Sequence, residues 1–372
     1  MKDFQQLKNR YPLAPVRIYR SAVKLLPFSK KAISYYILAA LFFFISFFSI
    51  SIINKYATTR HFHFNFSFLS PSIIITLAIL LIAYFLVDGL RLYYVVKAID
   101  CHIAIKEIMK LVFINIFVSN ITPLATGGGL AQVYFMTKRD MPMGKAMAAS
   151  TIRTFLAMMF LFVSAPFVVL YQRNLYDFMV STHTISIITL IVICYIFLFY
   201  VIIFKPRLIK IIVLDVVAVL RRLHFLSARR QRKWLKRAIR EVNNFSGSFT
   251  LFLSGHPRYI LLSIFFTVLF LLLLFSFSVV LVEAMGYHIS ILTILAMQAF
   301  VTFLMYFAPT PGASGVAEGG YALIFSRLIQ PADIATLTLL WRFFTIYIGM
   351  ITGIVIMYLE LSYKKESSHA AK

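Results

Sequence analysis

The sequence predicts an all-α polytopic membrane protein, with about six spanning helices, two oppositely inserted re-entrant hairpins that form an inverted repeat, and basic amphipathic helices on the cytoplasmic face. Of its 372 residues, 61% are hydrophobic and only 13% are charged, more apolar surface than a soluble fold of this size buries. Several apolar runs reach the roughly 20 residues that cross the hydrocarbon core of a bilayer. Two segments rich in proline and glycine interrupt such runs, and these breaks determine the rest of the prediction.

Positive charge is concentrated at the ends of the apolar runs. The net charge is +24, from 37 Lys and Arg against 13 Asp and Glu. The basic residues lie mainly in Met1–Lys31, in Lys205–Arg240 and at Lys364 and Lys365. This distribution favours cytoplasmic loops that face anionic lipid over a nucleic-acid binder. We therefore expect both termini in the cytoplasm, and the chain in the plasma (inner) membrane.

The sequence predicts no metal site and no cofactor. Cys101 and Cys194 are its two cysteines, and they suggest neither a disulfide framework nor a metal cluster. The eight histidines are scattered without a ligand spacing such as HExxH. Nothing resembles the GxxxxGK[ST] motif of ATP-binding proteins.

We expect a basic segment 1–31, a single integral membrane domain 32–361 and a cytoplasmic tail 362–372. The first apolar run is too long for a signal-peptide core and no small-residue cleavage pattern follows it, so it is read as an uncleaved helix. The spanning helices are predicted at Ala32–Ile53, Pro71–Val96, Lys145–Tyr171, Thr184–Phe204, Arg258–Glu283 and Ala332–Leu361.

The first break, Thr122–Gly129, is predicted to turn the chain back inside the membrane. If Lys106–Thr122 crossed completely, the basic residues from Lys138 to Lys145 would lie outside, against the positive-inside rule. A re-entrant hairpin that returns through Leu130–Thr137 avoids this.

The second break follows Ile289–Phe307. The last helix must end inside at Lys364, so Pro309–Phe325 has to return to the outer face. The alternative, in which both breaks are ordinary loops between full crossings, places basic loops outside.

The insert 205–245 contains apolar positions near helical spacing around Leu208–Leu226, followed by a strongly basic stretch. This pattern predicts two amphipathic helices on the inner leaflet, holding anionic head groups. The alternative is a solvated cytoplasmic loop.

The two breaks share a sequence pattern, T-P-x-A-[S/T]-G. It begins at Thr122 and again at Thr310, an offset of 310 − 122 = 188. Arg153 and Arg342 are separated by 342 − 153 = 189, and Pro71 and Pro257 by 257 − 71 = 186. The recurring offset indicates an internal duplication, with repeat 1 at about 71–171 and repeat 2 at about 257–360. Charges place the copies in opposite orientations, as in many secondary transporters.

Arg153 and Arg342 lie in apolar helices, where an unpaired guanidinium is costly and needs an anionic partner. Glu318 or Asp88 could be that partner, and so could the phosphate of a lipid, which a guanidinium binds through two hydrogen bonds. Backbone N–H groups at the breaks would face the same site. The predicted substrate-binding residues are Arg153, Arg342, Asn120, Thr122, Pro123, Thr126, Gly127, Gly128, Thr310, Pro311, Gly312, Ser314, Gly315 and Glu318, with Asp88 and Arg91 as cavity or coupling residues.

Two motifs resemble the membrane domain of the lysylphosphatidylglycerol synthase/flippase superfamily. They are Asn120-x-x-Pro123 with Gly127-Gly128, and Pro309-x-Pro311-Gly312-x-x-Gly315-x-x-Glu318. Many members have an acidic residue and an arginine just after the glycine pair, where this chain has Gly129 to Gln132. The resemblance implies movement of a lipid between leaflets. Members that make lysylphosphatidylglycerol carry a soluble acyltransferase-like domain after the membrane part, so lysyltransferase activity is not expected of this chain.

The expected function is therefore a flippase or transporter for an anionic phospholipid or polyprenyl-phosphate, with Glu318 as a charge partner or proton-coupling group. One alternative is a membrane-embedded transferase with Glu318 or Asp88 as its base, and another is a scaffold that does not transport. The expected partners are membrane lipids and no nucleic acid, and a homodimer is one alternative for the assembly.

Overall fold

The computed structural model describes residues 32–57, 66–171 and 228–370, with a few positions between 190 and 208. These ranges fold into helices and contain no β-strand. The elements are α3 (Ala32–Ala57), α4 (Pro71–Ala98), α5 (Ile105–Asn120), η1 (Pro123–Ala125), α6 (Thr126–Thr137), α7 (Met143–Tyr171), α10 (Ala228–Leu253), α11 (Pro257–Ala284), α12 (Ile291–Met305), η3 (Pro311–Ala313), α13 (Val316–Phe325), α14 (Pro331–Arg342), η4 (Phe343–Tyr347) and α15 (Ile348–Ala370).

The prediction of an all-helical polytopic membrane protein is confirmed. Four stretches of helix are long and apolar enough to cross a membrane: Pro71–Ala98, Met143–Ser164, Pro257–Ala284 and Pro331–Glu360. Shorter apolar helical stretches occur at Ile37–Ile53 and Ile291–Met305. The predicted basic segment 1–31 and most of the predicted span 184–204 lie outside the described residues.

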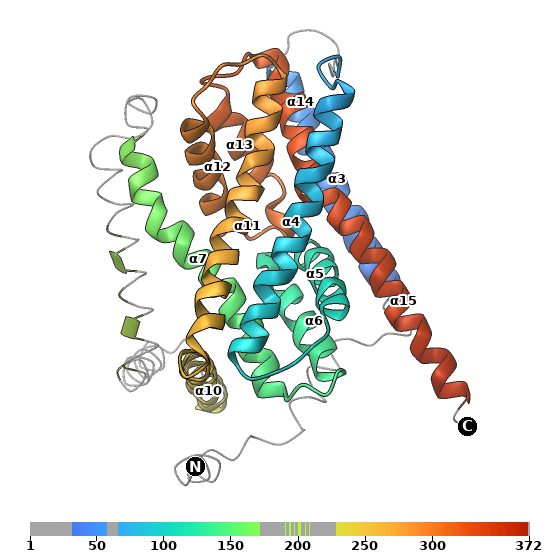
Figure 1. Cartoon of the computed structure of the whole chain (residues 1–372), viewed down its shortest axis with the longest axis vertical. Coiled ribbons are helices and arrows are strands. Elements are labelled where there is room, and N and C mark those ends of the chain that lie inside the picture. Colours follow the sequence, from blue (N-terminus) through green and yellow to red (C-terminus); the bar gives the residue numbers. More distant parts are fainter. Residues whose placement is uncertain are drawn as a thin grey trace.

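The long helices α4 and α11 lie side by side and run in opposite directions (Figure 1). Each has 28 residues and begins with a proline at the first helical position, Pro71 or Pro257, where the missing N–H costs nothing. Each is also followed by a residue with positive φ, Asp100 at 54° and Gly286 at 85°. The offset between these two residues is 286 − 100 = 186, the same as between the prolines. The two helices therefore share both their length and the backbone conformation that ends them.

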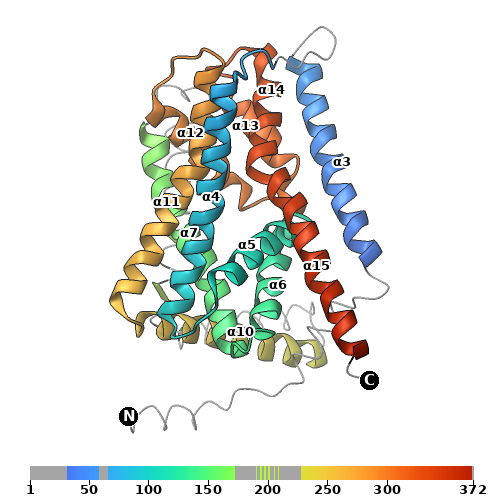
Figure 2. The same ribbon diagram turned by 45° about the vertical axis from the view of Figure 1, so that its right-hand side comes forward.

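Two short helical hairpins occupy opposite ends of the bundle (Figure 2). Hairpin 1 consists of α5, η1 and α6, and lies at the end where α10 is found. Hairpin 2 consists of α12, η3 and α13, and lies at the other end. In each hairpin, the residues between its two α-helices form its tip. The two tips contact each other through η1 and η3. The chain thus breaks twice in the middle of the bundle.

The predicted last helix, Ala332–Leu361, is present as one helical stretch, Pro331–Glu360. A π turn at Phe343–Tyr347 lies inside it, between α14 and α15, and the sequence did not predict this turn. A π turn adds one residue to a helical turn, and such turns occur often at functional sites. This one follows Arg342 directly. Beyond it α15 crosses α5 closely: a Cβ atom on Gly353 would overlap the carbonyl oxygen of Phe113.

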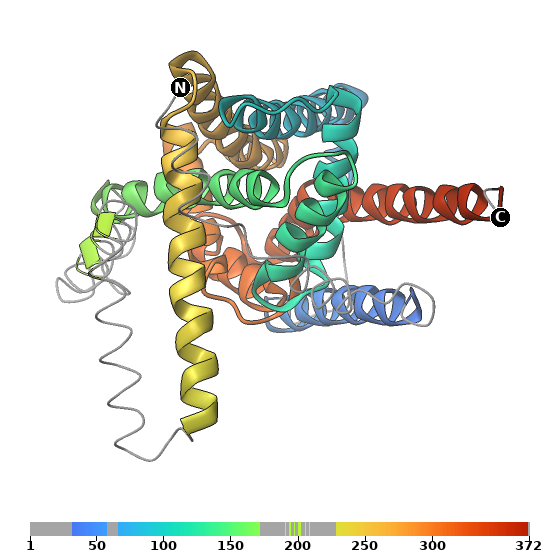
Figure 3. The ribbon, with the colours of Figure 1, turned by 90° about the horizontal axis from the view of Figure 1, so that it is seen from below.

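Helix α10 lies across one end of the bundle, at a large angle to the long helices (Figure 3). Its C-terminal half packs on α7, with the rings of Phe249 and Phe155 4.3 Å apart. The helix continues to Leu253, beyond the predicted insert 205–245. The predicted first amphipathic helix falls almost entirely outside the described residues.

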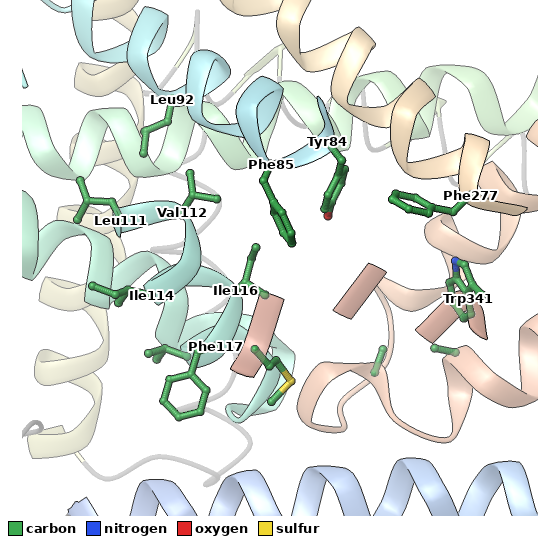
Figure 4. Packing of buried hydrophobic residues seen from close by; sticks show 14 of the residues in the cluster. Tyr84, Phe85, Leu92, Leu111, Val112, Ile114, Ile116, Phe117, Phe277 and Trp341 are labelled. Carbon is green, nitrogen blue, oxygen red and sulfur yellow. The ribbon is translucent and has the colours of Figure 1, made fainter. Parts of the chain in front are cut away.

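One large apolar cluster joins the two halves of the chain (Figure 4). Tyr84 and Phe85 of α4 point between Phe277 of α11 and the residues of α5, and Phe85 lies 4.7 Å from the ring of Phe113. In a bilayer such packing acts mainly through van der Waals contact rather than through removal of surface from water. The cluster fixes hairpin 1 against α4.

Candidate functional site where the two hairpins meet

The two tips share a strained backbone conformation. Leu124 and Ala125 have φ of 54° and 52°, and Gly312 and Ala313 have φ of 57° and 56°. The offset is again 312 − 124 = 188, so the offset that relates the two sequence motifs also relates their dihedral angles. A left-handed conformation costs about 1–2 kcal/mol for a residue with a Cβ atom. Three of these four residues carry one, which identifies the tips as backbone held in place by its surroundings.

The threonine of each motif closes its own tip. Thr122 Oγ1 accepts a hydrogen bond from the Gly127 N–H at 3.0 Å, and Thr310 Oγ1 donates to the Ser314 carbonyl at 2.8 Å. The tips are also in close contact with each other, because a Cβ atom on Gly312 would lie 2.7 Å from Asn120 Oδ1. These contacts bring together the two halves of the predicted site.

A buried ion pair stands behind the tip of hairpin 2. Arg342 Nε lies 2.9 Å from Glu318 Oε1, and both side chains are completely buried. The other carboxylate oxygen, Oε2, accepts from the Gly315 N–H at 2.7 Å, while Ser46 Oγ donates to Oε1 at 2.5 Å. Both oxygens of Glu318 are thus bonded, and one bond satisfies a backbone donor at the start of α13.

Arg342 also holds the tip directly. Its Nη2 donates to the Gly312 carbonyl at 3.2 Å, and its guanidinium carbon lies 5.2 Å from the centre of the Trp341 ring. Tyr347, in the π turn, places its hydroxyl 2.6 Å from Ser46 Oγ. Sequence reasoning missed Ser46 and Tyr347, since a serine or tyrosine in an apolar helix is an ordinary occurrence.

A second buried charge cluster stands behind hairpin 1, and it has a different composition. Arg153 Nη2 of α7 lies 2.5 Å from Asp88 Oδ2 of α4. Arg91 lies one turn further along α4, with its Nη1 3.7 Å from Asp88 Oδ1 and its guanidinium carbon 4.4 Å from the centre of the Phe270 ring. Arg91 Nη2 also donates to the Arg153 carbonyl at 3.4 Å. Two arginines therefore share one carboxylate.

Asn115 connects this cluster to hairpin 1. With its amide turned to satisfy both neighbours, the oxygen accepts from Arg153 Nη1 at 3.0 Å and the nitrogen donates to the Gly128 carbonyl at 3.2 Å. Ser150 of α7 donates to the next carbonyl, that of Gly129, at 3.3 Å. Sequence reasoning missed Asn115 as well, although a polar amide in the apolar stretch LVFINIF was a usable signal.

The open end of each hairpin is fastened by polar contacts. At hairpin 1, Lys110 bonds Glu107 at 2.8 Å and Glu360 of α15 at 2.9 Å, and Arg139 bonds both carboxylates as well. At hairpin 2, the Tyr287 hydroxyl donates to Asp333 Oδ2 at 2.6 Å.

Tyr287 lies in the loop between α11 and α12. Burial, together with its hydrogen bond to Asp333, raises the pKa of this tyrosine above its ordinary value. It therefore stays protonated and able to donate at neutral pH, because each of these effects favours the neutral phenol.

The predicted site residues differ in exposure. Pro123 and Thr126 are exposed at the tip of hairpin 1. The partly exposed ones are Thr122, Gly127, Thr310, Pro311, Gly312 and Gly315, and the buried ones are Asn120, Gly128, Ser314, Glu318, Asp88, Arg91, Arg153 and Arg342. Within the part of the chain that the structure describes, no three His, Cys, Asp or Glu side chains come together as a metal site would require.

Comparisons with known proteins agree with this architecture. The family model described as the lysylphosphatidylglycerol synthase TM region matches residues 30–353, which include both hairpins and both charge clusters. A UPF0104 membrane protein of Archaeoglobus fulgidus is 22% identical over 285 residues, which cover 76% of this chain and 85% of that protein. The chain belongs to the family of the lysylphosphatidylglycerol synthase transmembrane region.

Proposed function

We propose that this protein moves a lipid with an anionic, phosphate-bearing head group between the two membrane leaflets. The observation that carries the proposal is the meeting of two broken helical hairpins, inserted from opposite ends, in the middle of an apolar bundle. Irregular backbone at that depth is tolerated only where it is buried in protein or lines a wet cavity. Transporters with inverted repeats place their substrate at such a junction.

The geometry also supports a route along which a lipid could pass. The tip of hairpin 1 is exposed at Pro123 and Leu124, and that of hairpin 2 at Phe307 and Pro309. Rocking one hairpin against its partner would expose the contact between the tips to one leaflet and then to the other. The description of the family, which names the membrane region of a lipid synthase, supports a lipid as the substrate.

A transferase is the weaker candidate. A general base must reach the proton that it removes, and Glu318 is enclosed with both oxygens bonded. Asp88 is buried between two arginines, with Oδ2 bonded to Arg153 and Oδ1 3.7 Å from Arg91 Nη1. We therefore propose a transporter that makes and breaks no covalent bond. The observations give no specific support to a scaffold that does not transport.

Transport can be measured with purified protein in vesicles that carry fluorescent phosphatidylglycerol, using dithionite to quench the outer leaflet. We expect the protein to make the protected inner pool accessible, and Arg153→Gln to slow this at least tenfold. Arg258→Gln, which removes an exposed arginine at the start of α11, is the matched control and should transport like the wild type. If fluorescent lipid stays protected for every anionic lipid tried, the proposed function is wrong.

The proposed orientation places α10 and both termini in the cytoplasm and the chain in the plasma membrane, since α10 begins with a strongly basic stretch. Single cysteines at Lys138 and Arg327, in a chain with Cys101→Ser and Cys194→Ser, test this orientation with an impermeant thiol reagent. We expect Lys138→Cys to react only from the cytoplasm and Arg327→Cys only from outside. Reaction of both from one side would exclude oppositely inserted hairpins.

A further inference from the structure

The two charge clusters differ in their net charge. The buried charged side chains in the described part of the chain are Asp88, Arg91, Arg153, Glu318 and Arg342. Glu318 and Arg342 neutralise each other. Asp88 faces two arginines, so the cluster behind hairpin 1 carries one uncompensated positive charge. Such a charge inside a membrane protein requires an anion.

Unsatisfied hydrogen-bond donors occur in the same cluster behind hairpin 1. Arg91 is 4% exposed and Arg153 5% exposed, yet Nε and Nη1 of Arg91 and Nε of Arg153 find no hydrogen-bond acceptor among the described residues. At the other cluster, only Nη1 of Arg342 lacks one within the same ranges. Buried donors are normally satisfied. Asp88 Oδ1, 3.7 Å from Arg91 Nη1, also has no hydrogen bond within the described ranges, but one oxygen accepts at most two hydrogen bonds. Three unused donor atoms on two adjacent arginines therefore indicate a further acceptor with more than one oxygen atom.

The two hairpins also differ in whether a carboxylate lies at the start of their second helix. In hairpin 2, Glu318 supplies a negative charge to the start of α13 through the Gly315 N–H. The residue at the same place in hairpin 1, at 318 − 188 = 130, is Leu130, which is 60% exposed. The start of α6, which is the positive end of that helix, therefore has no carboxylate of its own. Asn115 ties this first turn to Arg153.

We infer that Arg91 and Arg153, with Asn115 and the first turn of α6, bind the phosphate of a singly charged phosphodiester head group. The inference rests on the proposed function and names the part of the junction that takes the phosphate. One negative charge would make the cluster neutral, and two would give it a net negative charge. The site should therefore select a phosphodiester, as in phosphatidylglycerol, over a doubly charged phosphomonoester. Arg342, already matched by Glu318, holds the tip of hairpin 2 instead.

Binding is measured by isothermal titration calorimetry on the purified full-length protein in detergent, at pH 8, where a phosphomonoester with a second pKa of about 6 is doubly charged. The ligands are dihexanoyl phosphatidylglycerol, dihexanoyl phosphatidate, glycerophosphoglycerol and inorganic phosphate. We expect dihexanoyl phosphatidylglycerol to bind most tightly. Arg91→Gln and Arg153→Gln should each weaken it at least tenfold, and the matched control Arg258→Gln should stay within twofold.

Asp88→Asn tests the same charge argument by increasing the net positive charge of the cluster, whereas the two arginine variants decrease it. It raises the uncompensated charge from one to two, and the preference should shift at least tenfold toward dihexanoyl phosphatidate. Arg153→Lys keeps the charge but loses the planar fork of donors, so its affinity should fall between those of the wild type and Arg153→Gln. If Arg91→Gln or Arg153→Gln does not fold, these two variants decide the question.

The assignment is overturned if Arg91→Gln and Arg153→Gln bind like the control, or if Asp88→Asn leaves the preference unchanged. Equal affinity for inorganic phosphate and the short-chain lipid would show a site for a small ion and would also overturn it. If lipid binding depends on both arginines but vesicles show no transport, the phosphate site is supported and the proposed function is refuted. If transport continues without both arginines, the proposed function is supported and the phosphate site is refuted.

Discussion

Replacing Glu318 with glutamine is expected to destabilise the protein by about 3–5 kcal/mol, because it leaves the buried Arg342 without a counter-charge. Arg342 is completely buried and pairs with Glu318 at 2.9 Å. The substitution is nearly isosteric, so the loss reports charge rather than packing. Thermal unfolding of the purified protein in detergent, followed by circular dichroism, measures the effect as a lower midpoint than that of the wild type.

The double variant Glu318→Gln/Arg342→Met is the control for this prediction. Removing both charges from a buried pair is often neutral or stabilising, whereas removing one is costly. We therefore expect the double variant to recover most of the midpoint that Glu318→Gln loses. If the single and double variants unfold at the same temperature, the ion pair is not what stabilises the tip of hairpin 2.

Gly312→Ala is expected to cost about 2–5 kcal/mol, from two effects that add. Gly312 has φ of 57°, a conformation that is unfavourable for a residue with a Cβ atom. The new methyl group would also overlap the ring of Phe42 and lie 2.7 Å from Asn120 Oδ1, across the contact between the tips. The same unfolding measurement detects the loss, and slower lipid transport should accompany it.

Gly319→Ala, seven residues further on, is the matched control. A Cβ atom there meets no described atom within 4 Å, and the residue lies inside α13. Alanine favours a helix over glycine by about 1 kcal/mol, so this variant should be as stable as the wild type or slightly more stable. Equal destabilisation by both substitutions would contradict the close contact at Gly312.

Much of the architecture could be predicted because it depends on local chemistry. Pro71 and Pro257 begin α4 and α11, as expected, because proline fits the first turn of a helix. The two T-P-x-A-[S/T]-G motifs mark the two breaks. Length and apolar composition were enough to identify four helices that can span a membrane.

The structure changed the interpretation of the two arginines that the sequence had paired by their offset. Their partners, Asp88 and Glu318, were both candidates, but nothing in the sequence determined which acid meets which arginine. The corresponding arginines also differ, since Arg153 shares Asp88 with Arg91 while Arg342 has Glu318 to itself. Offsets reveal a common origin for two segments, but they carry no information on later changes in their contacts.

The sequence by itself determined the class of fold, the positions of the breaks and the presence of costly charges in apolar helices, because periodicity, proline and hydrophobicity act over a few residues. Only the tertiary structure decided that Ser46 reaches Glu318 across 272 residues of chain, that a π turn follows Arg342 and that one charge cluster is neutral while the other is not. These features depend on which helices become neighbours, and in a bilayer many apolar faces are equally able to pack together.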